Sequence, residues 1–378
     1  MSEATRIRFF PVNNGDTTLI EAGGYAVLTD IHYRAECTDE NGEAYDFAPD
    51  LRGACKKNNH RLVLDVFVLT HPDKDHLTGF GKLLHLGYPD SYNQNPKDGE
   101  PLIFVNELWV SPYALEPGYT TEDSEPLVKE IQRRHKLQGT TDGNRDGNRL
   151  KVLSADGDET QGSVGQKLSW RLLAPTAKEA DIPPPKTDDN ETPNPSCNDS
   201  SLVIRWTLVE GDESADVLLG GDATVEVWDR IWHDYQKSPE LLTWHILLAP
   251  HHCSRGAMSR KDEESGEYDY SDDALDALAQ IDGDGFVVAS SKPIKRDDDN
   301  PPSWEAKQKY LEILRKGNST ADPETRFLNP ETHKDGKPAP VVFELTASGL
   351  RCKVPSKVSE KITKVSAAAL TPGRYGSK

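Results

Sequence analysis

The stretch HPDKDH at residues 71–76 places two imidazoles and two carboxylates within six positions. It follows RLVLDVFVLT at 61–70, an apolar run typical of a strand that is buried on both faces. Imidazole and carboxylate ligands together suit Zn²⁺ or Mn²⁺ better than Ca²⁺ or Mg²⁺, which prefer oxygen alone. The pattern predicts a transition-metal site at the end of this strand, with the ligands His71, Asp73, Asp75 and His76.

Two later apolar strands end in further candidate ligands. LLGGDA supplies Asp222, and LLAPHHCS supplies His251 and His252. Four ligand-type residues within six positions cannot all reach one ion, so we expect two neighbouring ions with Asp222 as the bridge. A glycine–aspartate pair is also a common turn, so Asp222 taken alone would be weak evidence for a ligand. It becomes a candidate because the other two clusters also follow apolar strands. We prefer His251 as the metal ligand, and His252 would contact substrate or orient a ligand.

The elements that must position these residues are mostly strands. Each polar cluster lies at the end of a strand, and a helix follows it. A one-domain, two-sheet sandwich of the α/β class, covered by helices, is the simplest architecture. We expect the domain to span 1–350 and a basic tail to span 351–378. Polar loop insertions are predicted near 34–60, 181–196 and 259–274.

Composition narrows the function classes. The chain has 378 residues, 35% of them hydrophobic, and a formal net charge of −19. Such a surface does not by itself attract nucleic acid or an anionic membrane, although bound divalent cations can reverse the field locally. Five scattered cysteines without a CxxC motif indicate reduced thiols. The chain shows no signal peptide and no run of about 18 apolar residues, so we expect a cytoplasmic protein without a membrane segment.

The three clusters resemble the motifs of the metallo-β-lactamase superfamily. They are most similar to the C-terminal hydrolase domain of ComEC-type competence proteins, which has His-x-Asp-x-Asp-His where most of the superfamily has His-x-His-x-Asp-His. The opening FFPVNNGDTTLIEAGGYAVLTD at 9–30 is similar to the family's first hairpin. NDSSLVIRW at 198–206 is similar to an Asn-rich stretch before its glycine–aspartate motif. The resemblance covers roughly residues 6–350.

This resemblance implies a metallo-β-lactamase-like αββα sandwich with its metal site at one edge. The ligand roles that it implies are His71 and Asp73 for one ion, Asp75 and His76 for the other, Asp222 as the bridge, and His251 to complete the second site. Asp30 would lie beside the ligands, and Asn198 or Asp199 would stand where other branches keep a metal-binding histidine.

The chain departs from the family at three places. Cys253 replaces the glycine of the family's HHGS motif. DDDNPPSW, after VVASS, lacks the His-Pro that the family often has there, and Asp30 is followed by IHYR instead of glycine.

The predicted function is metal-dependent hydrolysis of a phosphodiester, chiefly in nucleic acid. Two cations, Zn²⁺ first and Mn²⁺ as the alternative, would turn a bridging water into hydroxide and neutralise the phosphate. Asp73 or Asp75 would take the proton of that water. Lys74, Ser254 and Arg255 are placed in sequence to bind phosphate, or are solvated surface groups.

Two other functions remain open. The same hydroxide would attack a lactone, a thioester or a cyclic nucleotide, and the charge of −19 favours this small-molecule reading. The third reading is a metal-stabilised, non-catalytic module of a defence or DNA-processing assembly. The sequence identifies no protein partner.

Overall fold

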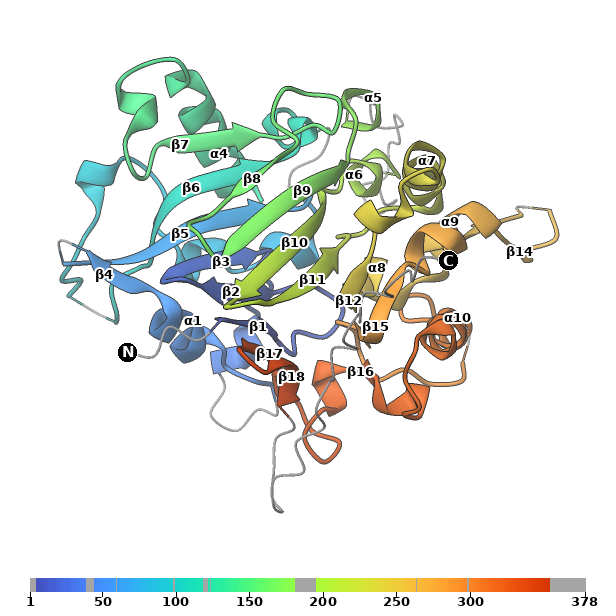
Figure 1. The fold of residues 1–378 in the computed structure, drawn as a ribbon. Helices are drawn as coiled ribbons and strands as arrows, with labels where there is room; N and C mark the ends of the chain where they lie inside the picture. The colour runs from blue at the N-terminus through green and yellow to red at the C-terminus, as the bar shows by residue number, and fades with distance from the viewer. Residues whose placement is uncertain are drawn as a thin grey trace, which may run out of the picture.

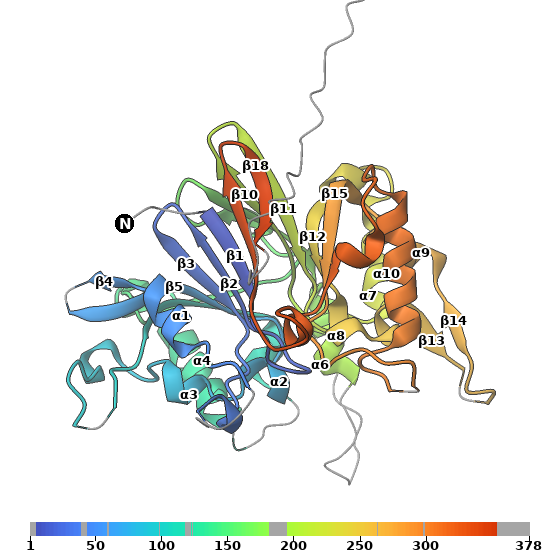
Figure 2. The same cartoon turned by 90° about the horizontal axis from the view of Figure 1, so that it is seen from below.

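Two large β-sheets pack face to face, and helices cover the outer face of each sheet (Figure 1). The computed structural model describes residues 5–38, 44–58, 60–97, 99–117, 122, 124–180, 195–262, 264–297 and 299–353. The expected α/β sandwich with the layer order helix, sheet, sheet, helix is confirmed (Figure 2). The predicted insertion near 181–196 falls mostly, and the basic tail after 353 wholly, outside the described residues.

The first sheet combines an antiparallel half with a parallel half and has nine strands in the described part of the chain. Strands β3, β5, β6 and β7 run parallel, and the strands from β18 to β3 run antiparallel. In spatial order they are β18 (Gly349–Lys353), β17 (Val341–Thr346), β1 (Thr5–Phe9), β2 (Thr18–Ala22), β3 (Tyr25–Thr29), β5 (Arg61–Leu69), β6 (Phe104–Val110) and β7 (Arg149–Val152), with β4 (Lys56–Asn58) beside β5.

The second sheet has seven strands within the described ranges, of which β11, β12, β15 and β16 are parallel. In spatial order they are β16 (Phe327–Leu328), β15 (Ile281–Val288), β12 (Trp244–Leu248), β11 (Glu213–Leu219), β10 (Val203–Glu210), β9 (Leu168–Ala174) and β8 (Gln161–Ser163). The insertion predicted near 259–274 forms a small separate hairpin of β13 (Ser259–Lys261) and β14 (Tyr268–Tyr270) and then enters a helix.

Helices fill the outer layers and the loops at the strand ends. The α-helices are α1 (Ala48–Ala54), α2 (Lys74–Leu77), α3 (Phe80–Leu83), α4 (Glu125–Leu137), α5 (Ala177–Ala180), α6 (Pro195–Asp199), α7 (Val225–Tyr235), α8 (Pro250–Cys253), α9 (Asp272–Leu278) and α10 (Trp304–Lys316). The 3₁₀ helices are η1 (Ala35–Thr38), η2 (Pro89–Ser91), η3 (Pro112–Leu115), η4 (Asp142–Asn144), η5 (Pro239–Leu241), η6 (Arg255–Ala257), η7 (Pro323–Thr325) and η8 (Pro330–Thr332). Helices α1, α3 and α4 cover the first sheet, and α7, α9 and α10 cover the second.

Strand β5 shows why the apolar run before the histidine cluster is continuous. Successive side chains of a strand point to opposite faces. Val66 and Val68 pack into the core between the sheets, whereas Phe67 and Leu69 pack toward the helices. Burial on both faces, as predicted from the sequence, holds the end of β5 rigidly and therefore fixes the position of the residues that follow it.

The strands that precede the candidate ligands end at one edge of the sandwich. Figure 2 shows α2, α6 and α8 together at this edge, after β5, before β10 and after β12 respectively. A backbone hydrogen bond from Leu202 N to Thr70 O, at 3.0 Å, ties the second sheet to the end of β5. Among the described residues, no helix is long and apolar enough to cross a membrane.

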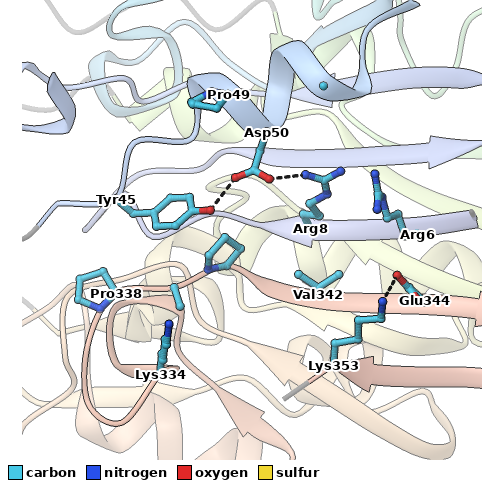
Figure 3. A pocket seen from close by; sticks show the side chains of 13 residues that line it. Arg6, Arg8, Tyr45, Pro49, Asp50, Lys334, Pro338, Val342, Glu344 and Lys353 are labelled. Carbon is cyan, nitrogen blue, oxygen red and sulfur yellow. Dashed lines mark hydrogen bonds and ion pairs between the residues drawn. The ribbon is translucent and has the colours of Figure 1, made fainter. Parts of the chain in front are cut away.

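A separate groove of about 790 Å³ lies on the outer face of the first sheet (Figure 3). Two ion pairs lie along it: Arg8 contacts Asp50 at 2.7 Å, and Lys353 contacts Glu344 at 2.5 Å. None of the predicted metal ligands lines this groove.

Three tryptophans stabilise the core between the sheets, and replacing one of them should destabilise the fold. The ring of Trp206 is fully buried and stacks on Trp109 at a centroid distance of 5.8 Å, and the ring of Trp170, opposite Trp206 on the neighbouring strand, lies 4.9 Å from that of Trp109. We expect Trp206→Ala to lower the free energy of unfolding by about 3–5 kcal/mol, measured by urea denaturation. Trp206→Phe keeps an aromatic ring and should cost less. Equal costs for the two variants would contradict the stacking argument.

Candidate metal centre

The predicted ligands converge although they come from three distant segments. His71 follows β5, His76 lies in α2, Asp222 follows β11, and His251 and His252 lie in α8. The side chains of His71 and His76 are 0% exposed, and that of Asp222 is 4% exposed. The centre is therefore closed to water on most sides.

The carboxylate of Asp222 is the point on which the imidazoles converge. Its Oδ1 lies 3.1 Å from His76 Nε2, and its Oδ2 lies 3.4 Å from His252 Nε2. Its Oδ2 is also 3.7 Å from His251 Nε2 and 4.0 Å from His71 Nε2. A carboxylate reached by imidazoles on both oxygens has the position that a bridging ligand needs. The bridging role itself stays a prediction.

Two more carboxylates close the ring of ligand atoms. Asp75 Oδ2 lies 3.1 Å from His252 Nε2, and Asp16 Oδ1 lies 3.6 Å from His252 Nδ1. Asp16, His76, Asp222 and His252 each offer one ligand atom, and these atoms all lie within 4.8 Å of one another. His71, Asp73 and Cys197 form a second group with the same property.

The hydrogen bonding of these atoms fits a cation. Five ligand atoms are buried and have no hydrogen-bond partner among the described residues: Asp16 Oδ1, His71 Nε2, His76 Nε2, Asp222 Oδ1 and His252 Nε2. A buried polar atom without a partner costs about 1–3 kcal/mol. Several of them at one place are explained by a ligand, and a mixture of imidazole and carboxylate is the donor set of Zn²⁺ or Mn²⁺.

Asp30 holds His76 in the orientation that this centre requires. Its Oδ2 lies 2.8 Å from His76 Nδ1 and accepts from Thr70 Oγ1 at 2.6 Å. Its Oδ1 accepts from the Thr70 backbone N–H at 2.8 Å. With Nδ1 engaged in this way, Nε2 of His76 points to Asp222. A carboxylate behind a metal-binding histidine fixes both its tautomer and its ring orientation.

The backbone of residues 251–253 is strained. His251, His252 and Cys253 have φ values of 51°, 52° and 67°, in the left-handed region that non-glycine residues seldom adopt. Such conformations cost on the order of 1–3 kcal/mol each. The strain lets two successive imidazoles face the same carboxylate. His252 is fully enclosed and His251 is 25% exposed, so the ligand choice between them stays a prediction.

Burial and charge shift the pKa values of the centre in opposite directions. Burial lowers the pKa of His71 to about 3. Burial would also lower the pKa of His76, but Asp222 and Asp30 more than offset it and hold this pKa well above its ordinary value. Burial would raise the pKa of Asp222, but His252 and His76 outweigh it and hold this pKa well below its usual range. The centre concentrates carboxylates and basic nitrogens in a dry space, the combination that a divalent cation neutralises.

The remaining predicted residues lie around the centre in different roles. The carboxylate of Asp73 caps α2 by accepting from Lys74 N at 2.7 Å, and Lys74 itself is exposed.

The two predicted phosphate-binding residues after α8 contact other side chains. Ser254 Oγ donates to Asn300 Oδ1 at 3.0 Å. The guanidinium of Arg255 lies 4.0 Å from the Tyr268 ring centroid and 3.7 Å from Glu305.

Asn198 and Asp199 lie at the end of α6, and their place in the family pattern stays a prediction. The carbonyl of Asn198 accepts from Ser201 N at 3.0 Å, and Asp199 Oδ1 accepts from Thr224 Oγ1. The bond from Thr224 holds α6 against the loop that carries Asp222.

Two residues of the ligand groups, Asp16 and Cys197, are absent from the candidates predicted from the sequence. Asp16 lies in the turn NNGD between two predicted strands. The structure shows why glycine precedes it, because a Cβ at Gly15 would overlap His32 Nδ1 and approach Asp75 O to 2.8 Å. Cys197 stands alone in the sequence, without a CxxC motif to mark it.

Comparisons with known proteins give a likeness of fold. No family model matches the chain, and no curated protein matches it. One similar solved structure is an isothiocyanate hydrolase from Delia radicum gut bacteria, at 13% identity and a TM-score of 0.38, over 88% of this chain and 97% of that one. A second is Tm1679, a metal-dependent hydrolase of the β-lactamase superfamily, at 12% identity and a TM-score of 0.36, over 86% and 95%.

A third is Igni18, a metallo hydrolase from the hyperthermophilic archaeon Ignicoccus hospitalis, at 11% identity and a TM-score of 0.38, over 90% of this chain and 99% of that one. Identities and scores this low do not transfer an activity. Function must therefore be argued from the residues of the centre, and the resemblance to the ComEC-type hydrolase domain stays a prediction from the motifs.

Metal binding should stabilise the fold, because the ligands come together only in the folded chain. At a Zn²⁺ concentration of about 100 times Kd, linkage adds about 2.7 kcal/mol to the free energy of unfolding. Thermal unfolding with Zn²⁺ and with a chelator measures the difference. Asp222→Asn should lose most of this gain. A chelator-treated protein that melts at the same temperature with and without Zn²⁺ or Mn²⁺ would contradict a metal centre.

Asp30→Asn tests the orienting role of Asp30. The amide keeps the size of the side chain but removes one acceptor from the pair that holds Thr70 and His76. Loss of such a partner weakens metal affinity by about 10–100-fold. Competition with a chromogenic chelator measures this affinity. Asp65→Asn, a buried carboxylate on β5 that accepts from Ala26 N instead, is the control and should leave the affinity unchanged.

Proposed function

We propose that the chain is a metal-dependent hydrolase of the metallo-β-lactamase type that cleaves phosphodiesters, chiefly in nucleic acid. The observation that carries this proposal is the buried convergence of imidazoles on Asp222, with Asp75 at the solvent side of the same cluster. The net charge of −19 would repel a phosphodiester unless cations neutralise the centre.

The residues that would hold the cations are those of the two ligand groups. His71 and Asp73 belong to one group, and His76, His252 and Asp16 belong to the other, with Asp222 between them. Divalent cations bound by such groups lower the pKa of water to near neutrality and polarise a phosphoryl oxygen. The protein contributes rigid positions, because the ligands sit at the ends of buried strands.

Asp75 is the best placed proton acceptor. Its side chain is 31% exposed, whereas His76 and His252, which contact it, are buried. Burial would raise its pKa, but the His252 imidazole, 3.1 Å from its Oδ2, and the charge of His76 outweigh that effect and keep the pKa low. The carboxylate therefore stays ionised at neutral pH and reaches solvent. Asp73 is the second candidate, and burial beside Asp75 raises its pKa.

Hydrolysis of a small molecule is the competing proposal, and the acidic surface supports it. A net charge of −19 opposes the approach of a nucleic acid but not of a neutral lactone or thioester. A metal-stabilised module without turnover is the third possibility. The same assay separates all three.

The assay offers Zn²⁺- or Mn²⁺-loaded protein single-stranded DNA, duplex DNA, a chromogenic phosphodiester and a lactone. We expect the phosphodiesters to be cleaved, and Asp75→Asn to lower kcat by about 10²–10⁴-fold through loss of the proton acceptor. Asp212→Asn, an exposed carboxylate in the turn between β10 and β11, is the matched control and should keep full activity.

Each outcome decides between the proposals. Turnover of the lactone alone supports the small-molecule hydrolase, and tight metal binding without any turnover supports the non-catalytic module. Full phosphodiesterase activity in Asp222→Ala would remove Asp222 from the centre.

A further inference from the structure

We propose that Cys197 is a metal ligand, and that its sulfur completes a cation site with His71 and Asp73. This inference rests on the metal centre of the proposed function. It goes further because it gives the two cation sites different chemistry, one with a thiolate and one with nitrogen and oxygen alone.

Geometry places the three ligand atoms together. One atom each from His71, Asp73 and Cys197 lies within 4.8 Å of the others. Nε2 of the fully buried His71 has no hydrogen-bond partner among the described residues, and Cys197 is itself buried. A tetrahedral Zn²⁺ with ligand distances of about 2.0–2.3 Å brings its ligand atoms to separations below this limit.

The backbone around Cys197 is held where a ligand must be. Leu202 N donates to Thr70 O at 3.0 Å, directly before His71. Asp222 N donates to Ser201 Oγ at 3.2 Å, and Ser200 Oγ donates to Cys197 O at 2.7 Å. The segment 197–202 is thereby tied both to the end of β5 and to the loop after β11. Figure 2 shows α6 at the same edge as α2 and α8.

The family resemblance puts Asn198 or Asp199 where other branches keep a metal-binding histidine. The side chain of Asp199 accepts a hydrogen bond from Thr224 Oγ1, and neither Asn198 nor Asp199 belongs to a ligand group among the described residues. Cys197, one position earlier, is the residue of this segment that joins a ligand group.

A purely structural role for Cys197 is the competing explanation. The side chain packs with Tyr113 and Ala180, so it also fills a small apolar cluster. Cys253 is a nearby cysteine that has only a packing role. It is buried beside the histidines, but its sulfur approaches Ser303 O at 3.9 Å and it belongs to no ligand group.

A thiolate ligand has a chemical consequence for the choice of metal. When the cation binds, the S–H bond of Cys197 breaks, the sulfur keeps the electron pair for the metal, and the proton passes to solvent. Thiolates select Zn²⁺ over Mn²⁺ and Mg²⁺, which prefer oxygen ligands. The site of His71 should therefore bind Zn²⁺ selectively, and the site of His76 should accept Mn²⁺ as well.

Cobalt substitution tests the proposal directly, because a sulfur–cobalt bond gives an intense near-ultraviolet charge-transfer absorption that nitrogen and oxygen ligands do not. We expect this band in Co²⁺-loaded wild-type protein. It should be lost in Cys197→Ser and in Cys197→Ala, with bound metal falling from about two ions to about one per chain. Cys253→Ser should keep both the band and the metal content.

The outcomes separate this proposal from the one on which it rests. Wild-type protein that binds Co²⁺ and cleaves phosphodiesters but shows no charge-transfer band would overturn the role of Cys197 and leave the proposed function standing. Wild-type protein that binds no Co²⁺, Zn²⁺ or Mn²⁺ would overturn both. Because the deciding spectrum is that of the wild type, the test holds even where a variant fails to fold.

Discussion

The structure depends on one electrostatic constraint, which is the burial of the Asp222 carboxylate at the edge of the sandwich. Removing an ionised carboxylate from water costs several kcal/mol unless partners compensate. His76 lies 3.1 Å and His252 lies 3.4 Å from this carboxylate. The imidazoles in turn are buried and leave nitrogens without hydrogen bonds. The cluster has the donor set that a divalent cation would balance.

The fold bears backbone strain in order to build this unit. Asp30 and residues 251–253 have positive φ values without being glycine, and both segments touch the cluster. Gly221, at φ +49°, lets the chain pass so close to Thr70 that a Cβ would lie 2.9 Å from it. Strain of this kind persists only where the surrounding core over-determines it. The two sheets and the stacked tryptophans between them supply that support.

The surface and the candidate metal centre differ in the electrostatic field that they present to a substrate. The chain carries a net charge of −19, so a polyanionic substrate gains nothing from the surface as a whole. On the proposed function, affinity for phosphate would come from cations held inside a shell of neutral and anionic ligands. A thiolate in one of the two sites would make those cations unequal. The metal preference of one site would then depend on Cys197, which lies outside the motifs recognised in the sequence.

The sequence by itself determined the strands, their two-sided burial and the clusters at their ends, because these depend on the order of apolar and polar residues along the chain. It placed β5 with its buried faces and the ligand types of 71–76, 222 and 251–252, and it led to the αββα architecture. Tertiary structure alone decided which atoms meet. Asp16 and Cys197 join the ligand groups across about 60 and 120 residues of chain, through loop hydrogen bonds that no local pattern encodes. The left-handed backbone at 251–253 is held by backbone hydrogen bonds to Gly221 and Ser303, which are distant in sequence, so the orientation of the two histidines could not be predicted from their spacing.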